Sequence, residues 1–95
     1  MAITQIRERD VEQYLLKQCR AHNLLCLKFT SPGRAGVPDR IIVGSGSTVF
    51  VEIKAPGCKP RPLQLATFAK IEAFGGRVFV VDSFSEIDEL MSLLK

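Results

Sequence analysis

"DRIIVGSGSTVFVEIK", residues 39–54, places two apolar runs on either side of a short glycine–serine segment, and this stretch decides the fold. The runs at 39–43 and 48–54 are rich in β-branched residues and predict two strands, which the GSGS turn joins into an antiparallel hairpin. Three charged residues interrupt them, namely Asp39, Glu52 and Lys54. Charges beside a sheet core cost free energy unless they are paired or used, so these positions need an explanation.

The chain before the hairpin predicts a helix followed by a strand. Residues 5–22 are expected to be helical, with Thr4 as N-cap, because apolar side chains recur at helical spacing at Val11, Leu15 and Cys19. Residues 24–30 predict a strand with its apolar face at the alternate positions 25, 27 and 29.

The chain after the hairpin predicts helix, strand and helix. Pro62 suits the first turn of a helix that ends at Gly75-Gly76. Residues 77–81 predict a buried strand, and Ser83 with Glu86 forms a capping box that begins the last helix. The order α-β-β-β-α-β-α predicts one α/β domain over residues 1–95, a small mixed sheet flanked by helices, whose last two strands are parallel.

Composition excludes several classes of protein. No apolar run approaches the roughly 20 residues that span a bilayer, and the first ten residues are charged where a signal peptide is apolar. We therefore expect an intracellular, cytoplasmic protein. The three cysteines lack CxxC spacing, which argues against a disulfide framework and against a zinc site.

The net charge of +3 is unevenly distributed along the chain. Residues 28–61 contain six basic and two acidic residues, a balance of +4, whereas the rest contains seven basic and eight acidic residues, a balance of −1. The excess surrounds the unusual charges of the hairpin. Such a cluster favours a polyanion such as nucleic acid, although a solvated surface is the other interpretation.

The hairpin brings two carboxylates together. Antiparallel pairing about a turn near Ser45 and Gly46 places Asp39 almost opposite Glu52, and opposed residues on one face have Cβ atoms about 5 Å apart. Two carboxylates at that spacing repel each other unless a cation lies between them. Mg²⁺ prefers hard oxygen ligands, commonly one or two carboxylates with water and substrate phosphate, so a divalent metal site is predicted.

Two further residues belong to the same prediction. Lys54 follows Glu52 by two positions and so points to the same face of its strand, where an ammonium can orient a water or stabilise charge on a phosphate. Gln64, in the first turn of the next helix, could hydrogen-bond a water or a phosphate oxygen. A surface Glu–Lys pair and a surface glutamine are the simpler alternatives.

A third acid could come from the first helix. Glu8 is expected on the core-facing side of that helix, about 20° from the centre of its apolar stripe at 100° per residue, and Glu12 is the alternative about 60° away. Glu8 also lies near the helix N-terminus, where a carboxylate is favoured.

"GVPDR", "VFVEIKAPG" and "PLQL" together resemble the VRR-NUC (virus-type replication-repair nuclease) domain, a branch of the PD-(D/E)xK nuclease superfamily that is similar to Holliday-junction resolvases. The spacing is PD-x12-ExK-x9-Q, and the resemblance extends from Glu8 to about Asp82. It implies a restriction-endonuclease-like core, αβββαβ, here followed by a C-terminal helix.

The resemblance also implies roles for individual residues. Asp39, Glu52, the backbone carbonyl of Ile53 and Glu8 would bind Mg²⁺ or Mn²⁺, with Lys54 and Gln64 completing the catalytic set. The basic residues that would hold DNA backbone phosphates are Lys28, Arg34, Arg40, Lys59 and Arg61.

The implied activity is structure-selective endonucleolytic hydrolysis of DNA, at branched substrates such as Holliday junctions, by a homodimer of phage type acting in the host cytoplasm. No small-molecule cofactor is expected, and one metal or two per site stays open. The alternative is a non-cleaving nucleic-acid-binding module on the same fold, which would have lost an acid or the lysine. A third is an adaptor-like partner protein without metal dependence.

Overall fold

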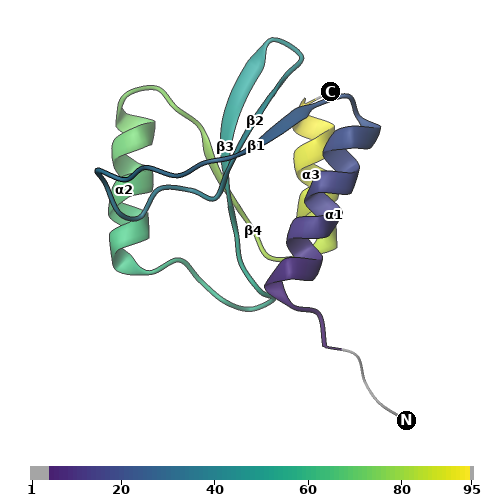
Figure 1. The fold of residues 1–95 in the computed structure, drawn as a ribbon, viewed down its shortest axis with the longest axis horizontal. Helices are drawn as coiled ribbons and strands as arrows, with labels where there is room; N and C mark the ends of the chain where they lie inside the picture. Colours follow the sequence, from purple (N-terminus) through teal and green to yellow (C-terminus); the bar gives the residue numbers. More distant parts are fainter. Residues whose placement is uncertain (1–4, 95) are drawn as a thin grey trace.

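A computed structural model describes residues 5–94, and its secondary structure follows the predicted order (Figure 1). Its elements are α1 (Glu8–Ala21), β1 (Leu25–Lys28), β2 (Arg40–Gly44), β3 (Ser47–Ile53), α2 (Pro62–Ala73), β4 (Val78–Val81) and α3 (Phe84–Leu94). The first helix begins later than expected, with Arg7 at its N-cap, and Thr4 lies outside the described residues.

The four strands form one mixed sheet in the order β1-β2-β3-β4. The pairs β1–β2 and β2–β3 are antiparallel, and β3–β4 is parallel because α2 makes the crossover between them. Helices α1 and α3 lie together on one side of the sheet and α2 on the other (Figure 1). This arrangement confirms the predicted small mixed α/β architecture.

The core lies between the sheet and the α1–α3 pair. Val49, Val51 and Ile53 alternate along β3 and are almost fully buried on this side, and they pack with apolar side chains of both helices. The helical members of this core are Val11, Leu15, Cys19, Ile87, Leu90, Met91 and Leu94. Because a strand alternates its side chains, Phe50 and Glu52, which lie between these three residues, point to the α2 side.

The apolar face predicted for the first strand is not its buried face. Leu24, just before β1, is buried and Cys26 packs against the core, whereas Leu25 and Leu27 are 56% and 45% exposed. Both alternating sets of this segment are apolar, so periodicity could not choose between them. The register is set by pairing with β2, in which Leu25 opposes Val43 and Cys26 opposes Ile42.

The segment between β1 and β2 docks on α2. The Thr67 hydroxyl donates a hydrogen bond to the Ala35 carbonyl at 3.2 Å. Gly36 has a φ of +83°, and a Cβ built there would lie 2.9 Å from the Thr67 hydroxyl oxygen and 3.0 Å from the Leu63 carbonyl oxygen. Only glycine accommodates both the backbone angle and this close approach, so the segment is held tightly against the helix.

Among the described helices, none is long and apolar enough to cross a membrane.

Candidate active site

The hairpin places the two predicted carboxylates side by side. Its turn has positive φ at both Ser45 (52°) and Gly46 (77°), as a two-residue turn joining twisted strands requires. Arg40 pairs with Val51 in the resulting register, so Asp39, one residue before β2, lies level with Glu52. The Ile53 N–H donates to Asp39 Oδ2 at 2.9 Å, which fixes the aspartate against the end of β3.

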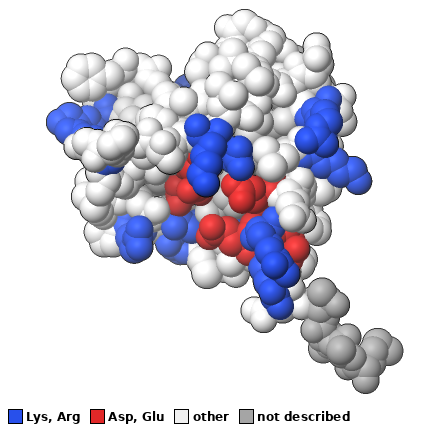
Figure 2. Space-filling model, viewed as in Figure 1, with Lys and Arg blue, Asp and Glu red and all other residues white. Residues whose placement is uncertain are grey.

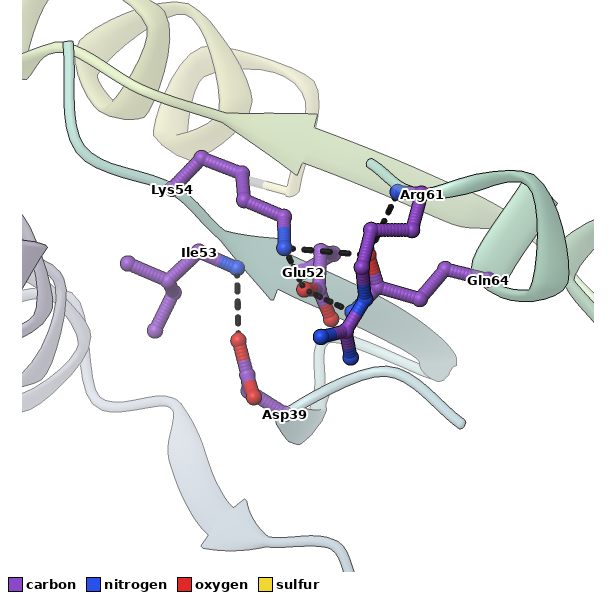
Figure 3. A network of polar contacts seen from close by, with 6 residues as sticks. All are labelled: Asp39, Glu52, Ile53, Lys54, Arg61 and Gln64. Carbon is purple, nitrogen blue, oxygen red and sulfur yellow. Dashed lines mark hydrogen bonds and ion pairs between the residues drawn. The ribbon is translucent and has the colours of Figure 1, made fainter. Parts of the chain in front are cut away.

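Glu52, Lys54 and Gln64 form a closed polar network (Figure 3). The Lys54 ammonium contacts Glu52 Oε2 at 3.0 Å and donates to Gln64 Oε1 at 3.0 Å, and Gln64 Nε2 donates to Glu52 Oε2 at 3.0 Å. Gln64 is 7% exposed, which rules out a free surface glutamine. The predicted orientation of Lys54 toward the side of Glu52 is confirmed.

Gln64 has a second contact that sequence reasoning missed. Its Oε1 also accepts the Arg61 N–H at 2.8 Å, so this side chain caps the first turn of α2. The signal was present in the sequence, since a glutamine at the third helical position behind a proline at the first can form half of a capping box. The cap fixes the amide at the site.

Glu52 is almost fully buried, and only one of its two carboxylate oxygens is paired. Its residue exposure is 2%, and its Oε1 is a buried oxygen without a hydrogen-bond partner in the described part of the chain. Burial raises the pKa of Glu52, the hydrogen bond from Lys54 lowers it, and the negative charge of Asp39 raises it, for a net increase. A cation bound at Oε1 would remove both the desolvation penalty and the repulsion from Asp39.

The donor set fits a hard divalent cation. It consists of Glu52 Oε1, the Asp39 carboxylate and the backbone carbonyl of Ile53. The Phe50 N–H donates to the carbonyl of Arg77, just before β4, and the Lys54 N–H donates to the carbonyl of Val81 in β4. By strand alternation the backbone polar groups of Ile53 therefore face the β2 side, where Asp39 lies. Two carboxylates with one carbonyl leave positions for water and phosphate, which is the usual environment of protein-bound Mg²⁺.

The expected third acid is not brought to this set. Glu8 is exposed at the first residue of α1, and the buried stripe of that helix begins only at Val11. The expectation that Glu8 faces the core is therefore wrong, because the first turn carries no buried residue. Within residues 5–94, no three His, Cys, Asp or Glu side chains are clustered so as to hold a metal ion.

Glu12, the alternative acid, is engaged elsewhere. Its Oε2 accepts two hydrogen bonds from the Arg40 guanidinium, at 3.0 and 3.2 Å, across 28 residues of sequence. The Arg40 side chain is only 15% exposed and is held by this ion pair, so its contact with DNA phosphate stays a prediction. This pair bridges α1 to β2 on the side of the sheet opposite Glu52.

The other predicted phosphate contacts are exposed. Lys28 lies at the end of β1, Arg34 in the docked segment, and Lys59 and Arg61 before α2. In Figure 3 the Arg61 side chain extends toward the carboxylates. On the face drawn in Figure 2, acidic side chains gather near the middle and basic side chains border them on several sides. The arrangement can attract a phosphate while keeping the acidic donors for a cation.

Comparisons with known proteins place the chain among nuclease relatives. No protein-family model matches the chain. A curated phage protein, "Putative nuclease p44" of Acyrthosiphon pisum secondary endosymbiont phage 1, is 47% identical over 79 residues, which cover 82% of this chain and 85% of that protein. A solved structure described as "VRR_NUC domain" superposes with a TM-score of 0.81 at 34% identity and covers 90% of this chain and 94% of its own. The identities and coverage are high enough to show kinship rather than a shared fold alone, and the chain belongs to the VRR-NUC family of nucleases, with a phage protein among its relatives.

Proposed function

We propose that the protein is a Mg²⁺- or Mn²⁺-dependent endonuclease that hydrolyses phosphodiester bonds in DNA. The observation that carries the proposal is the buried Glu52, whose Oε1 has no partner among the described residues although Asp39 and Lys54 lie beside it. A buried carboxylate oxygen without a partner costs free energy in a purely structural role. The same oxygen is available as a ligand if a cation binds there.

The chain's own groups divide the work of hydrolysis. Asp39, Glu52 and the Ile53 carbonyl would hold the metal, which when bound supplies Lewis-acid stabilisation of charge on the phosphoryl group. Lys54 has three protons, of which Glu52 and Gln64 engage two. The third can hydrogen-bond the attacking water or a phosphate oxygen. Gln64 acts through Lys54 and Glu52, since it holds both in place.

Branched DNA is the substrate we propose. The exposed basic residues around the site suit contacts to backbone phosphates, which position DNA without reading its sequence. No helix with base-reading character accompanies them among the described elements, which favours recognition of DNA shape. The non-cleaving alternative expects one of the site residues to be missing, and the chain retains Asp39, Glu52, Lys54 and Gln64.

We expect purified protein to cut a labelled four-way junction in Mg²⁺ or Mn²⁺ and to stop when EDTA is added. Removing the metal would remove the Lewis acid that stabilises charge on the phosphoryl group, and Lys54, the ion-pair partner of Glu52, cannot replace it, so cutting should fall to background. Flap, nicked and linear duplex substrates of matched sequence measure the selectivity. Cutting that persists in EDTA would contradict metal dependence, and equal cutting of linear duplex would contradict branch selectivity.

We further propose a homodimer, in which each copy supplies one site for one of two strands. β1 lies at an edge of the sheet, and it exposes Leu25 and Leu27 beside Val43, which is 37% exposed. An exposed apolar edge strand favours association through that edge. The dimer would act in the cytoplasm of a bacterial host.

Light scattering should therefore give twice the chain mass, and Leu27→Asp should give the monomer mass, because a charge in an apolar interface is strongly unfavourable. Leu93→Asp is the matched control, since Leu93 is a 63% exposed leucine on α3. A wild-type monomer at micromolar concentration would contradict the dimer, and dissociation by both variants would contradict this interface.

A further inference from the structure

A pocket of about 360 Å³ lies between the docked segment, β3 and α2. Its walls are mostly apolar, and three of its lining side chains are phenylalanines. It is lined by Phe29, Ser31, Arg34, Val37, Phe50, Thr67, Lys70, Ile71 and Phe74. None of these residues belongs to the proposed metal site or to its polar network.

The pocket continues the side of the sheet on which the proposed active site lies. Phe50 precedes Glu52 by two residues on β3, so the two side chains point the same way about 7 Å apart along the strand. On α2, Thr67 follows Gln64 by three residues and shares its buried face. A strand of DNA with one phosphate at the carboxylates therefore reaches the pocket with a neighbouring nucleotide.

The charge and chemistry of the pocket fit a nucleotide. Phe29 and Phe50 pack with ring centroids 5.7 Å apart, and Phe74 is 86% exposed at the end of α2. Arg34 and Lys70 are exposed lining residues, and neither makes an ion pair with another described side chain. Aromatic rings stack on any base and free cations take backbone phosphates, which is how single strands are bound without sequence preference.

The pocket is built before any ligand arrives. The hydrogen bond from Thr67 to Ala35 and the close contact of Gly36 with α2 hold its outer wall in place. A preformed apolar site adds little ordering cost on binding. A base stacked within a duplex cannot enter such a site, whereas a base already unstacked at a branch can.

We propose that this pocket receives an unpaired base adjacent to the phosphate that is cut, stacked on Phe74 and the Phe29–Phe50 pair, with Arg34 and Lys70 on the flanking phosphates. The proposal rests on the proposed nuclease function and deepens it. Branch selectivity would then come from the availability of an unstacked base as well as from the shape of the DNA.

The test measures binding without cleavage. A four-way junction carries 2-aminopurine at one position beside the branch, in a series that moves the probe one nucleotide at a time, and fluorescence is followed on adding protein in EDTA. The fluorescence of 2-aminopurine reports its stacking. We expect one or two probe positions to change fluorescence with wild-type protein.

The variants assign the change to the pocket. Phe74→Ala should remove the change at those positions and weaken junction binding about tenfold, as loss of one base-stacking ring does. Arg34→Ala and Lys70→Ala should each weaken binding and reduce its salt dependence. Leu93→Ala and Arg20→Ala, exposed on α3 and α1, are the matched controls and should leave both readings unchanged.

The outcomes separate this proposal from the proposed function. If the junction is bound and, with Mg²⁺, cut while Phe74→Ala behaves like Leu93→Ala, the pocket proposal is overturned and the nuclease stands. A junction that is neither bound nor cut by wild-type protein overturns both. If Phe74→Ala instead halves the mass measured by light scattering, the pocket is an interface between copies and the base site is overturned.

Discussion

Glu52→Gln is expected to lower the rate of DNA cleavage by about a thousandfold or more while leaving DNA binding within a few-fold of wild type. The amide keeps the shape of Glu52 and can still contact Lys54 and Gln64, but it loses the negative charge needed to hold a divalent cation. We expect the exposed basic residues, which the substitution does not change, to provide most of the DNA affinity. Single-turnover cleavage in Mg²⁺ and a binding titration in EDTA measure the two effects separately.

The matched control is Glu89→Gln, which removes an exposed carboxylate on α3 and should cleave like wild type. A second reading concerns the metal itself, since Mg²⁺ should raise the thermal midpoint of wild-type protein but not that of Glu52→Gln. A Glu52→Gln variant that cleaves within tenfold of wild type would remove Glu52 from the metal site.

The same variant also tests the raised pKa of Glu52 in metal-free protein. A carboxyl whose pKa is higher in the folded state binds its proton more tightly there. Its contribution to stability is therefore full below the unfolded pKa and is lost as pH rises through the folded pKa. As pH rises from about 4 to neutral, the free energy of unfolding of wild type should therefore fall relative to that of Glu52→Gln. Urea unfolding in EDTA across this range measures the trend, and a wild type whose free energy of unfolding rises relative to that of Glu52→Gln as pH rises would contradict it.

Lys54→Ala is expected to lower cleavage by about a hundredfold to ten-thousandfold, which is the range for losing a positioned proton donor or acceptor. It should also lower the stability of metal-free protein at pH 7 by roughly 1–3 kcal/mol, because the buried Glu52 loses its ion-pair partner. Mg²⁺ should then restore more stability to Lys54→Ala than to wild type, since it becomes the principal counter-charge of the carboxylate.

Lys17→Ala is the control for charge alone, since Lys17 is exposed on α1 and away from the carboxylates. Cleavage and unfolding midpoints of both variants are compared at equal ionic strength. Wild-type cutting by Lys54→Ala would show that the assignment of the lysine is wrong. A stable Lys54→Ala that fails to cut would show that its effect is confined to chemistry.

The hairpin made the centre of the site predictable from sequence. Its turn chemistry fixes the register, and a strand period of two then determines that Glu52 and Lys54 share a side. These are local rules, and they act within the span of residues 39–54. The opposition of Asp39 and Glu52 needed no knowledge of the helices.

Such local rules could not predict contacts between elements that are distant in the sequence. The pairing of Arg40 with Glu12 joins residues 28 positions apart in the sequence, and the residues next to each of them do not predict it. The burial of Gln64 depends on α2 packing beside β3, which converts a residue typical of a helix surface into part of the site. The exposure of Glu8 was not predicted for a related reason. Helical periodicity gives the direction of a side chain but does not show whether the core extends to its turn.

The double engagement of Gln64 links the geometry of the candidate site to the order of a helix end. The same amide oxygen receives the Arg61 N–H, which caps α2, and the Lys54 ammonium, and its nitrogen bonds Glu52. If the first turn of α2 frays, the lysine and the glutamate lose their shared anchor at the same moment. If the proposed roles of Lys54 and Glu52 hold, a DNA strand that presses on the segment before α2 would change the positions of both groups through Gln64.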